Sequence, residues 1–177
     1  MKKLLTLLTL PIITFGTPAT AQETHAGATG AATGDPSYLS LGLGIFDVFD
    51  DDEATDFRLE YRDGTPVLWR IKPYVGGELT TDGSVWAGGG LYADFYATNE
   101  VVITPSWGVG LYNDGSSDLD LDYPLQFRAQ IEAAYQFYSG SRLGVSYNHT
   151  SNYDLGDTNP GTDTIGVYYH LPIRSLF

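Results

Sequence analysis

The chain of 177 residues has the length of one domain, and because it contains no cysteine a disulfide-stabilised scaffold is excluded. Its formal net charge of −13 argues against nucleic acid as a partner, since phosphate binding requires basic patches. The composition, 14% aromatic with 13 tyrosines and 21 glycines, suits both β-barrels and soluble β-sandwiches, and the order of residues distinguishes the two.

Residues 1–21 have the three parts of a secretory signal peptide. Two lysines follow the first methionine, Leu4 to Phe15 form a short apolar run, and Ala19-Thr20-Ala21 is a small-x-small cleavage site. The apolar run is too short to span a bilayer as a helix, which requires about 20 apolar residues. We expect cleavage after Ala21, followed by a flexible lead-in over residues 22–37, which are rich in Gly, Ala and Thr.

Residues 38–177 contain eight strand-like runs separated by clusters of turn residues. We expect these strands at Tyr38–Phe49, Thr55–Tyr61, Trp69–Thr80, Ser84–Tyr96, Val101–Tyr112, Leu125–Phe137, Arg142–Ser151 and Asp163–Ile173. Strand side chains alternate between two faces, and apolar and polar residues alternate in these runs. In the sixth run one face carries Leu125, Phe127, Ala129, Ile131, Ala133 and Tyr135, and the other carries Gln126, Arg128, Gln130, Glu132 and Gln136.

The polar faces of these strands carry nearly balanced charge, with Arg58, Arg62, Arg70, Lys72 and Arg128 against Glu60, Glu78 and Glu132, and with Asp94 close by. An eight-stranded barrel has an interior just wide enough for side chains, so it is not a porin, and buried charges have to be paired. The balance suits an eight-stranded antiparallel transmembrane β-barrel with a polar lumen and a lipid-facing apolar surface. The alternative is a soluble barrel whose charges face water. The signal peptide and the C-terminal Phe177, which resembles the assembly signal of outer-membrane barrels, favour the Gram-negative outer membrane.

The connections between the strands also fit a membrane barrel. With eight strands and both chain termini in the periplasm, residues near 50–54, 81–83, 113–124 and 152–162 face the outside of the cell, and the turns near 62–68, 97–100 and 138–141 face the periplasm. Long outer loops and short inner turns are typical of such barrels. The acidic surplus lies in the outer loops, at Asp50, Asp51, Asp52, Glu53, Asp114, Asp118, Asp120 and Asp122. These residues form either solvated loops or sites that share divalent cations with anionic lipopolysaccharide.

A histidine, a serine and a carboxylate are expected to meet at the end of the seventh strand. His149 and Ser151 are two residues apart, so they share a face, and this is the apolar, outward one. One register of the last hairpin places Asp163 opposite His149, with Cβ atoms about 4.5–5.5 Å apart. Serine as nucleophile, histidine as base and a carboxylate that orients the imidazole are the parts of an esterase. The spacing alone also fits an interfacial histidine beside a turn aspartate.

The sequence motifs around these residues resemble a known family. His149-Thr150-Ser151-Asn152, the segment 159–163 (NPGTD) and the segment 169–173 (YHLPI) resemble the end of the PagL-type lipid A 3-O-deacylases. Residues 43–49 and 125–128 are also similar to family members. The resemblance covers most of the mature chain and is strongest in the last thirty residues.

The resemblance implies an eight-stranded outer-membrane barrel that removes the ester-linked 3-hydroxyacyl chain from lipid A. It also implies that His149 is the general base and Ser151 the nucleophile. The third member in the family is usually Glu, whereas this chain has Asp163, which is one methylene shorter. Asp157 and Asp154 in the same loop are less favoured substitutes for it.

An oxyanion site should accompany such a triad. Asn152 and Asn159 are the side-chain candidates, and backbone N–H groups around Gly156 or Gly161 are the alternative donors. Both asparagines could instead only shape the loop. His170 falls on the inward face of the last strand, where we expect it to form hydrogen bonds within the lumen. The sequence contains no zinc-ligand cluster or nucleotide-binding motif, and the expected chemistry requires no cofactor.

The leading hypothesis is therefore a serine esterase that acts on lipid A, the lipopolysaccharide anchor, from within the outer leaflet of the membrane. One alternative is a non-catalytic structural or adhesin-like barrel. Another is an esterase of a different outer-leaflet lipid. The sequence leaves open the acyl-chain specificity, latency in the native membrane, and whether the chain forms a homodimer.

Overall fold

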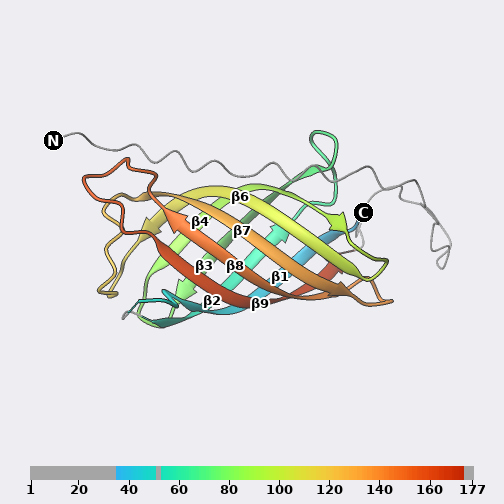
Figure 1. The fold of residues 1–177 in the computed structure, drawn as a ribbon, viewed down its shortest axis with the longest axis horizontal. Helices are drawn as coiled ribbons and strands as arrows, with labels where there is room; N and C mark the ends of the chain where they lie inside the picture. Colours follow the sequence, from blue (N-terminus) through green and yellow to red (C-terminus); the bar gives the residue numbers. More distant parts are fainter. Residues whose placement is uncertain (1–34, 51–52, 174–177) are drawn as a thin grey trace. The chain divides into compact units, whose positions relative to one another are not determined.

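The computed structural model describes residues 35–50 and 53–173, and within them the chain forms a single antiparallel β-sheet that closes on itself (Figure 1). The strands are β1 Ser37–Phe46, β2 Ala54–Arg62, β3 Ile71–Thr80, β4 Val85–Ala93, β5 Phe95–Tyr96, β6 Val101–Asn113, β7 Leu125–Gln136, β8 Arg142–Ser151 and β9 Thr162–Ile173. No helix in this described part is long and apolar enough to cross a membrane.

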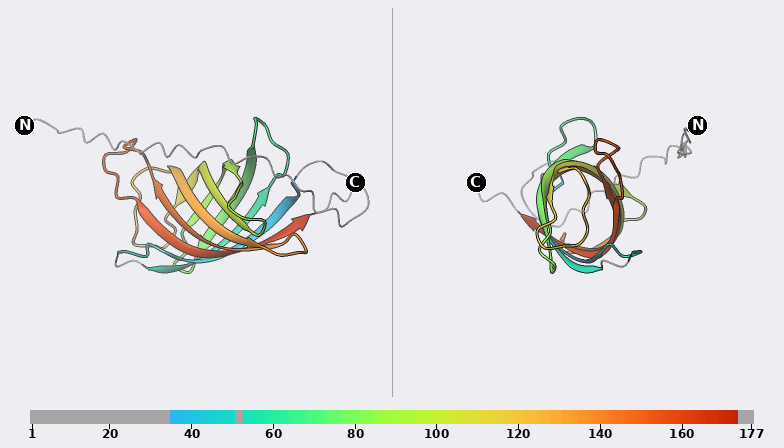
Figure 2. Two further views of the ribbon diagram at one scale, coloured as in Figure 1. Left: turned by 45° about the vertical axis from the view of Figure 1, so that its right-hand side comes forward. Right: turned by 90° about the vertical axis from the view of Figure 1, so that its left-hand side faces the viewer.

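The sheet closes because β1 pairs with β9 and β4 pairs with β6, and the end-on view in Figure 2 shows the resulting ring. The two-residue β5 continues the line of β4 after Asp94 and pairs with the same neighbour, β6, so the barrel is eight-stranded. The predicted eight-stranded antiparallel barrel is confirmed. The predicted signal peptide, most of the lead-in, Asp51, Asp52 and Phe177 lie outside the described residues.

Two strands are shorter than the sequence pattern predicts. The first ends at Phe46 because Asp47 has φ of 56°, and the third begins at Ile71 because Trp69 has φ of 52°. A residue in this left-handed region cannot continue a β-ladder, so each marks the start or end of a turn. The apolar residues of both predicted ends therefore lie in connections and not in the sheet.

The connections gather at two ends of the barrel, which we call the loop end (47–50, 53, 81–84, 114–124 and 152–161) and the turn end (63–70, 97–100 and 137–141). This grouping agrees with the predicted outer and inner sets. The predicted length asymmetry is wrong in one place, since the connection 63–70 at the turn end is longer than 81–84 at the loop end. Backbone hydrogen bonds of 2.8 Å, from Val67 N to Ile71 O and from Ile71 N to Leu68 O, give the connection 63–70 the form of a small hairpin.

The two faces of the barrel wall have the predicted polarity. Side chains that point outward are mostly apolar and exposed, as the values of 53% for Leu59 and 61% for Val145 illustrate. Their inward neighbours Arg58, Glu60 and Ser146 are each no more than 5% exposed. An apolar surface that no protein atom covers is stable in hydrocarbon, so the arrangement is that of a membrane barrel.

The middle of the lumen is filled by ion pairs and not by a hydrophobic core. Arg62 Nη2 lies 3.0 Å from Glu132 Oε2, and Glu132 Oε1 lies 2.7 Å from His170 Nε2. Asp94 Oδ2 lies 2.7 Å from Lys72 Nζ and 3.0 Å from Arg142 Nη1. Each charge is thus met by an opposite one, which offsets the cost of its burial. The predicted lumen position of His170 is confirmed, since it is 1% exposed and also bonds Ser40 at 2.7 Å.

One predicted lumen charge lies elsewhere. Arg70 is exposed in the connection 63–70, where its guanidinium lies 5.6 Å from the centre of the Trp69 ring. In the alternation of β3 its position would be an inward one, but β3 begins at Ile71, one residue after it. The lumen instead gains Asp56 and Arg142, which are 1% and 3% exposed.

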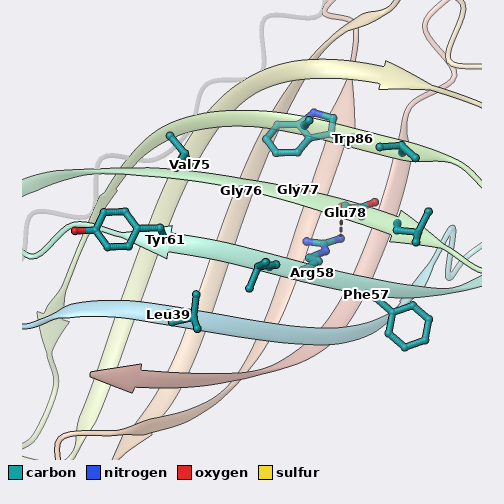
Figure 3. Close-up of a pocket in the computed structure, with 13 residues that line it drawn as sticks. Leu39, Phe57, Arg58, Tyr61, Val75, Gly76, Gly77, Glu78 and Trp86 are labelled. Carbon is teal, nitrogen blue, oxygen red and sulfur yellow. Dashed lines mark ion pairs between the residues drawn. The ribbon is translucent and has the colours of Figure 1, made fainter. Parts of the chain in front are cut away.

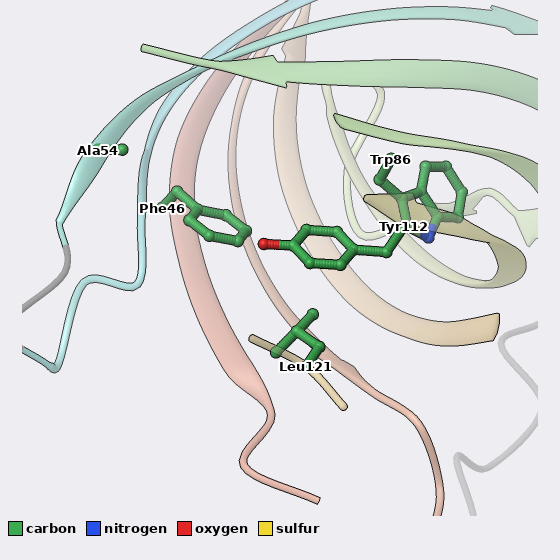
Figure 4. Packing of buried hydrophobic residues seen from close by; sticks show 5 residues of the cluster. All are labelled: Phe46, Ala54, Trp86, Tyr112 and Leu121. Atoms are coloured by element: carbon green, nitrogen blue, oxygen red, sulfur yellow. The ribbon is translucent and has the colours of Figure 1, made fainter. Parts of the chain in front are cut away.

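Apolar side chains close the lumen at the loop end. Figure 4 shows Phe46, Tyr112, Leu121 and Trp86 converging inside the barrel, and Ala54 completes this cluster. Leu121 belongs to the connection 114–124 and is only 1% exposed. This connection therefore folds inward over the opening of the barrel at the loop end. The charged lumen is therefore covered by protein at the end where the candidate site lies.

Candidate active site

The candidate site lies on the β8–β9 hairpin at the loop end. The register places His149 directly opposite Asp163, as the sequence predicts, and His149 Nδ1 lies 2.9 Å from Asp163 Oδ1. The register is well defined because a slip by one residue would turn every apolar side chain of the strand into the lumen. The side chains are 49% and 27% exposed, so the pair faces outward from the barrel wall.

The hydrogen bond to Asp163 decides which imidazole nitrogen can act as a base. A carboxylate accepts hydrogen bonds, so Nδ1 carries the proton and the lone pair is on Nε2. This is the tautomer that a nucleophilic serine requires. Asp163 is one methylene shorter than Glu, yet it reaches the ring because the two residues are directly opposed. Asp154 and Asp157, the less favoured substitutes, are exposed in the connecting loop.

Ser151 is on the same outward face of β8, half-buried and opposite Phe127 of β7. Among the hydrogen bonds of the described residues, none joins Ser151 to His149. Hydrogen bonds between a nucleophile and its base are often long in the absence of substrate. The structure thus brings the three predicted side chains to one patch, with the histidine–carboxylate contact formed and the serine contact open.

Gly161 is a part of the site whose steric role the sequence analysis missed. Its φ is 70°, and a Cβ built on it would lie 2.9 Å from Cε1 and 3.2 Å from Nε2 of His149. The backbone of the loop therefore passes against the Cε1–Nε2 edge of the imidazole, where only glycine leaves room. The position of Gly161 in NPGTD predicts a backbone donor but does not reveal that His149 is its neighbour.

The two asparagines that were candidate oxyanion donors have different surroundings. Asn152 is 1% exposed, and its Nδ2 donates to Leu121 O at 3.1 Å and Thr158 O at 2.7 Å. Its two amide hydrogens are thus both used, which favours the alternative that Asn152 shapes the loop. Asn159 is exposed and its Oδ1 accepts the backbone N–H of Asn152 at 3.2 Å. That contact leaves its Nδ2 as the side-chain candidate.

The loop that carries Asn159 is tied to the neighbouring connection 114–124. Thr158 N donates to Asp122 Oδ2 at 2.7 Å, next to the Asn152–Leu121 bond. Asp122, Tyr153 and Asp154 have φ of 63°, 57° and 62°. Such conformations cost free energy and persist where surrounding contacts impose them. The two connections therefore hold each other's shape beside the site.

Three aromatic rings form a cluster next to Ser151, with one stacked pair and one edge-to-face pair. The rings of Trp107 and Phe127 are 5.7 Å apart at 27°, and those of Phe127 and Tyr153 are 5.9 Å apart at 62°. All three belong to the outward surface. The strand alternation predicts Phe127 on that surface, but its position opposite Ser151 follows only from the β7–β8 register.

The alternatives to the His149–Ser151–Asp163 patch are two other kinds of site, a surface hollow and a metal centre. A surface hollow of about 650 Å³ lies over β1–β4 and is lined mainly by outward apolar side chains around Gly76 and Gly77 (Figure 3). The Arg58–Glu78 pair at its floor belongs to the lumen network. Within the described residues, no three His, Cys, Asp or Glu side chains are grouped as metal ligands.

The comparison with family models decides the assignment. The model described as lipid A 3-O-deacylase (PagL) matches residues 55–172, which include the whole β8–β9 hairpin up to Pro172. The chain belongs to the lipid A 3-O-deacylase family. No curated protein sequence matches the chain.

Solved structures agree with the family fold. "Crystal structure of the outer membrane enzyme PagL" matches with a TM-score of 0.60 and 21% identity, over 77% of this chain and 99% of that one. A structure from "De novo design of transmembrane beta-barrels" matches with a TM-score of 0.54 and 13% identity, over 77% and 96%. At these identities the matches show the fold alone. The family and the closed barrel together identify a lipid A deacylase of the Gram-negative outer membrane, the fold and location expected from the sequence.

Proposed function

We propose that this deacylase is a serine esterase that hydrolyses the ester-linked 3-hydroxyacyl chain at the 3-position of lipid A. Ser151 is the nucleophile, His149 the general base and Asp163 the carboxylate that orients the imidazole. The observation that carries the proposal is the 2.9 Å contact between His149 Nδ1 and Asp163 Oδ1 on the face that Ser151 shares. All three side chains come from one hairpin, so a single copy of the chain can complete the chemistry.

The reaction proceeds in two steps on this triad. Ser151 Oγ attacks the ester carbonyl while His149 Nε2 takes its proton, and the proton then passes to the sugar oxygen as the C–O bond breaks. Water attacks the acyl-enzyme, gives one proton to His149, and releases the 3-hydroxy fatty acid as Ser151 regains its proton. The developing oxyanion needs donors within reach, for which Asn159 Nδ2 and the backbone N–H groups near Gly161 are candidates.

The outward position of the site suits a substrate that never leaves the membrane. Lipid A in the outer leaflet can diffuse laterally to the β8–β9 patch if the loop end faces the outside of the cell. The cluster of Trp107, Phe127 and Tyr153 offers the acyl chain an apolar surface beside Ser151. Lipopolysaccharide is thus both the partner and the substrate in this proposal.

The test is mass spectrometry of lipid A from a Gram-negative host that expresses the chain, beside a Ser151→Ala variant. We expect the native chain alone to remove one 3-hydroxyacyl mass, and tandem spectra to assign the loss to the 3-position. Identical spectra from two folded proteins would favour the non-catalytic barrel. Cleavage of purified phospholipid but not of lipid A would favour an esterase of another lipid.

A further inference from the structure

Asp163 accepts a second hydrogen bond that the triad chemistry does not account for. Tyr147 Oη lies 2.6 Å from Asp163 Oδ1, the same oxygen that His149 Nδ1 contacts at 2.9 Å. Among the described residues, no side chain or backbone group bonds Asp163 Oδ2. The carboxylate is therefore held through one oxygen, by two donors from β8.

The strand geometry explains how the two donors converge. Tyr147 and His149 are two residues apart on β8, so both point outward, and Tyr147 is opposite Ile165 of β9. Asp163 is thus the diagonal neighbour of Tyr147, a separation of about 7–8 Å that an aromatic side chain can span. The phenol and the imidazole lie on the two sides of one short carboxylate.

The chemistry of this contact favours a fixed carboxylate. A distance of 2.6 Å is in the range of about 2.5–2.7 Å found for O–H groups that donate to an ionised oxygen. A carboxylate on the lipid-facing surface of a barrel is unfavourable unless it is hydrogen-bonded. The phenol meets this requirement without a second charge, since the described residues place no Arg or Lys against Asp163.

We propose that Tyr147 is a positioning residue for the deacylation, an inference that rests on the proposed function. Its hydroxyl holds the Asp163 carboxylate in the rotamer in which Oδ1 faces His149 Nδ1. It does not touch the substrate. Without it the carboxylate can rotate away from the imidazole, because a single hydrogen bond from His149 remains.

The first experiment compares Tyr147→Phe with Tyr169→Phe in the full chain, folded in mixed micelles with lipid A. Tyr169 is an outward tyrosine of the same hairpin, and its hydroxyl bonds no other residue that the structure describes. We expect Tyr147→Phe to lower kcat about tenfold while KM changes less than about twofold. Tyr169→Phe should match the native chain. An unchanged or raised kcat in Tyr147→Phe would overturn the inference, the latter because it would mean that the phenol competes with His149 for Oδ1.

A double-mutant cycle separates positioning from a general structural role. In an Asp163→Ala background the hydroxyl of Tyr147 has nothing to hold, so Tyr147→Phe should have no further effect on kcat. Equal effects in both backgrounds would contradict the inference. Mobility on unheated gels reports whether each variant is a folded barrel, so a folding defect is not mistaken for lost positioning.

A second readout keeps the inference distinct from the identity of the substrate. A fluorophosphonate labels an activated serine by displacement of fluoride from phosphorus, and its labelling rate at Ser151 does not depend on lipid A. We expect Tyr147→Phe to slow labelling about as much as it lowers kcat. Labelling of the native chain without lipid A cleavage would refute the proposed substrate and leave Tyr147 to be judged by labelling rates. No labelling and no cleavage would refute both the esterase and the role of Tyr147.

Discussion

At the scale of single residues, the candidate site depends on how short side chains meet across one hairpin. Asp163 contacts His149 at 2.9 Å because the two are directly opposed, so the missing methylene relative to Glu does not open a gap.

Asp163→Asn tests the carboxylate. The amide can donate to Nδ1 and so stabilise the wrong imidazole tautomer, and we expect kcat to fall by about 10³-fold or more. Asp157→Asn, in the exposed part of the same loop, should retain activity. Release of 3-hydroxy fatty acid from lipid A measures both. If Asp157→Asn were the inactive variant, the acid of the triad would be Asp157.

Gly161→Ala tests the contact between the loop and the imidazole. A methyl group 2.9 Å from His149 Cε1 must displace the ring, so we expect a loss of kcat of about tenfold or more. Gly140→Ala is the matched control, because Gly140 also has positive φ (84°) but its Cβ would meet only Pro172 Cγ at 3.8 Å. Both variants carry the same backbone strain, about 1–2 kcal/mol. Equal activities would show that the ring has space to move.

At the scale of elements, the connection 152–161 takes its shape from its neighbour. The backbone of Thr158 and the side chain of Asn152 both bond residues of the connection 114–124. A loop with such positive-φ residues is poorly determined by its own sequence. The connection 114–124 therefore helps to fix the shape of the loop between Ser151 and Asp163.

Asp122→Ala tests this coupling. Loss of the acceptor for Thr158 N should loosen the connection 152–161, lower kcat several-fold, and speed chymotryptic cleavage after Tyr153 or Leu155. Asp118→Ala, exposed in the same connection, should change neither quantity. Unchanged cleavage in Asp122→Ala would mean that the Asn152–Leu121 bond is sufficient alone.

At the scale of the whole molecule, stability comes from a sheet without edges and a lumen of paired charges. Glu132 is central in the lumen, because it contacts both Arg62 and His170 and is 1% exposed. Removing Glu132 leaves Arg62 with Glu60 as its remaining carboxylate and leaves His170 Nε2 buried without its partner. The lipid-facing side chains contribute little to the free energy of folding within the membrane, since lipid tails are as apolar as these side chains.

Glu132→Ala should destabilise the barrel by about 3–5 kcal/mol, because it leaves Arg62 with one carboxylate and His170 without its acceptor. Glu100→Ala, exposed in the connection 97–100, should leave stability unchanged. The midpoint of urea unfolding in detergent, followed by tryptophan fluorescence, measures the difference. A Glu132→Ala barrel as stable as the native chain would mean that water or Glu60 replaces the lost partner.

The sequence by itself determined the barrel, the polarity of its faces and the meeting of His149, Ser151 and Asp163. These follow from the period-two alternation of strands and from one register that the last hairpin allows, in which His149 is opposite Asp163. Only the tertiary structure decided that Arg70 leaves the lumen, that the Asn152 amide donates to Thr158 O and to Leu121 O, and that Gly161 and Tyr147 contact the triad. These depend on where a strand starts, on bonds between loops distant in sequence, and on side-chain rotamers, none of which alternation specifies.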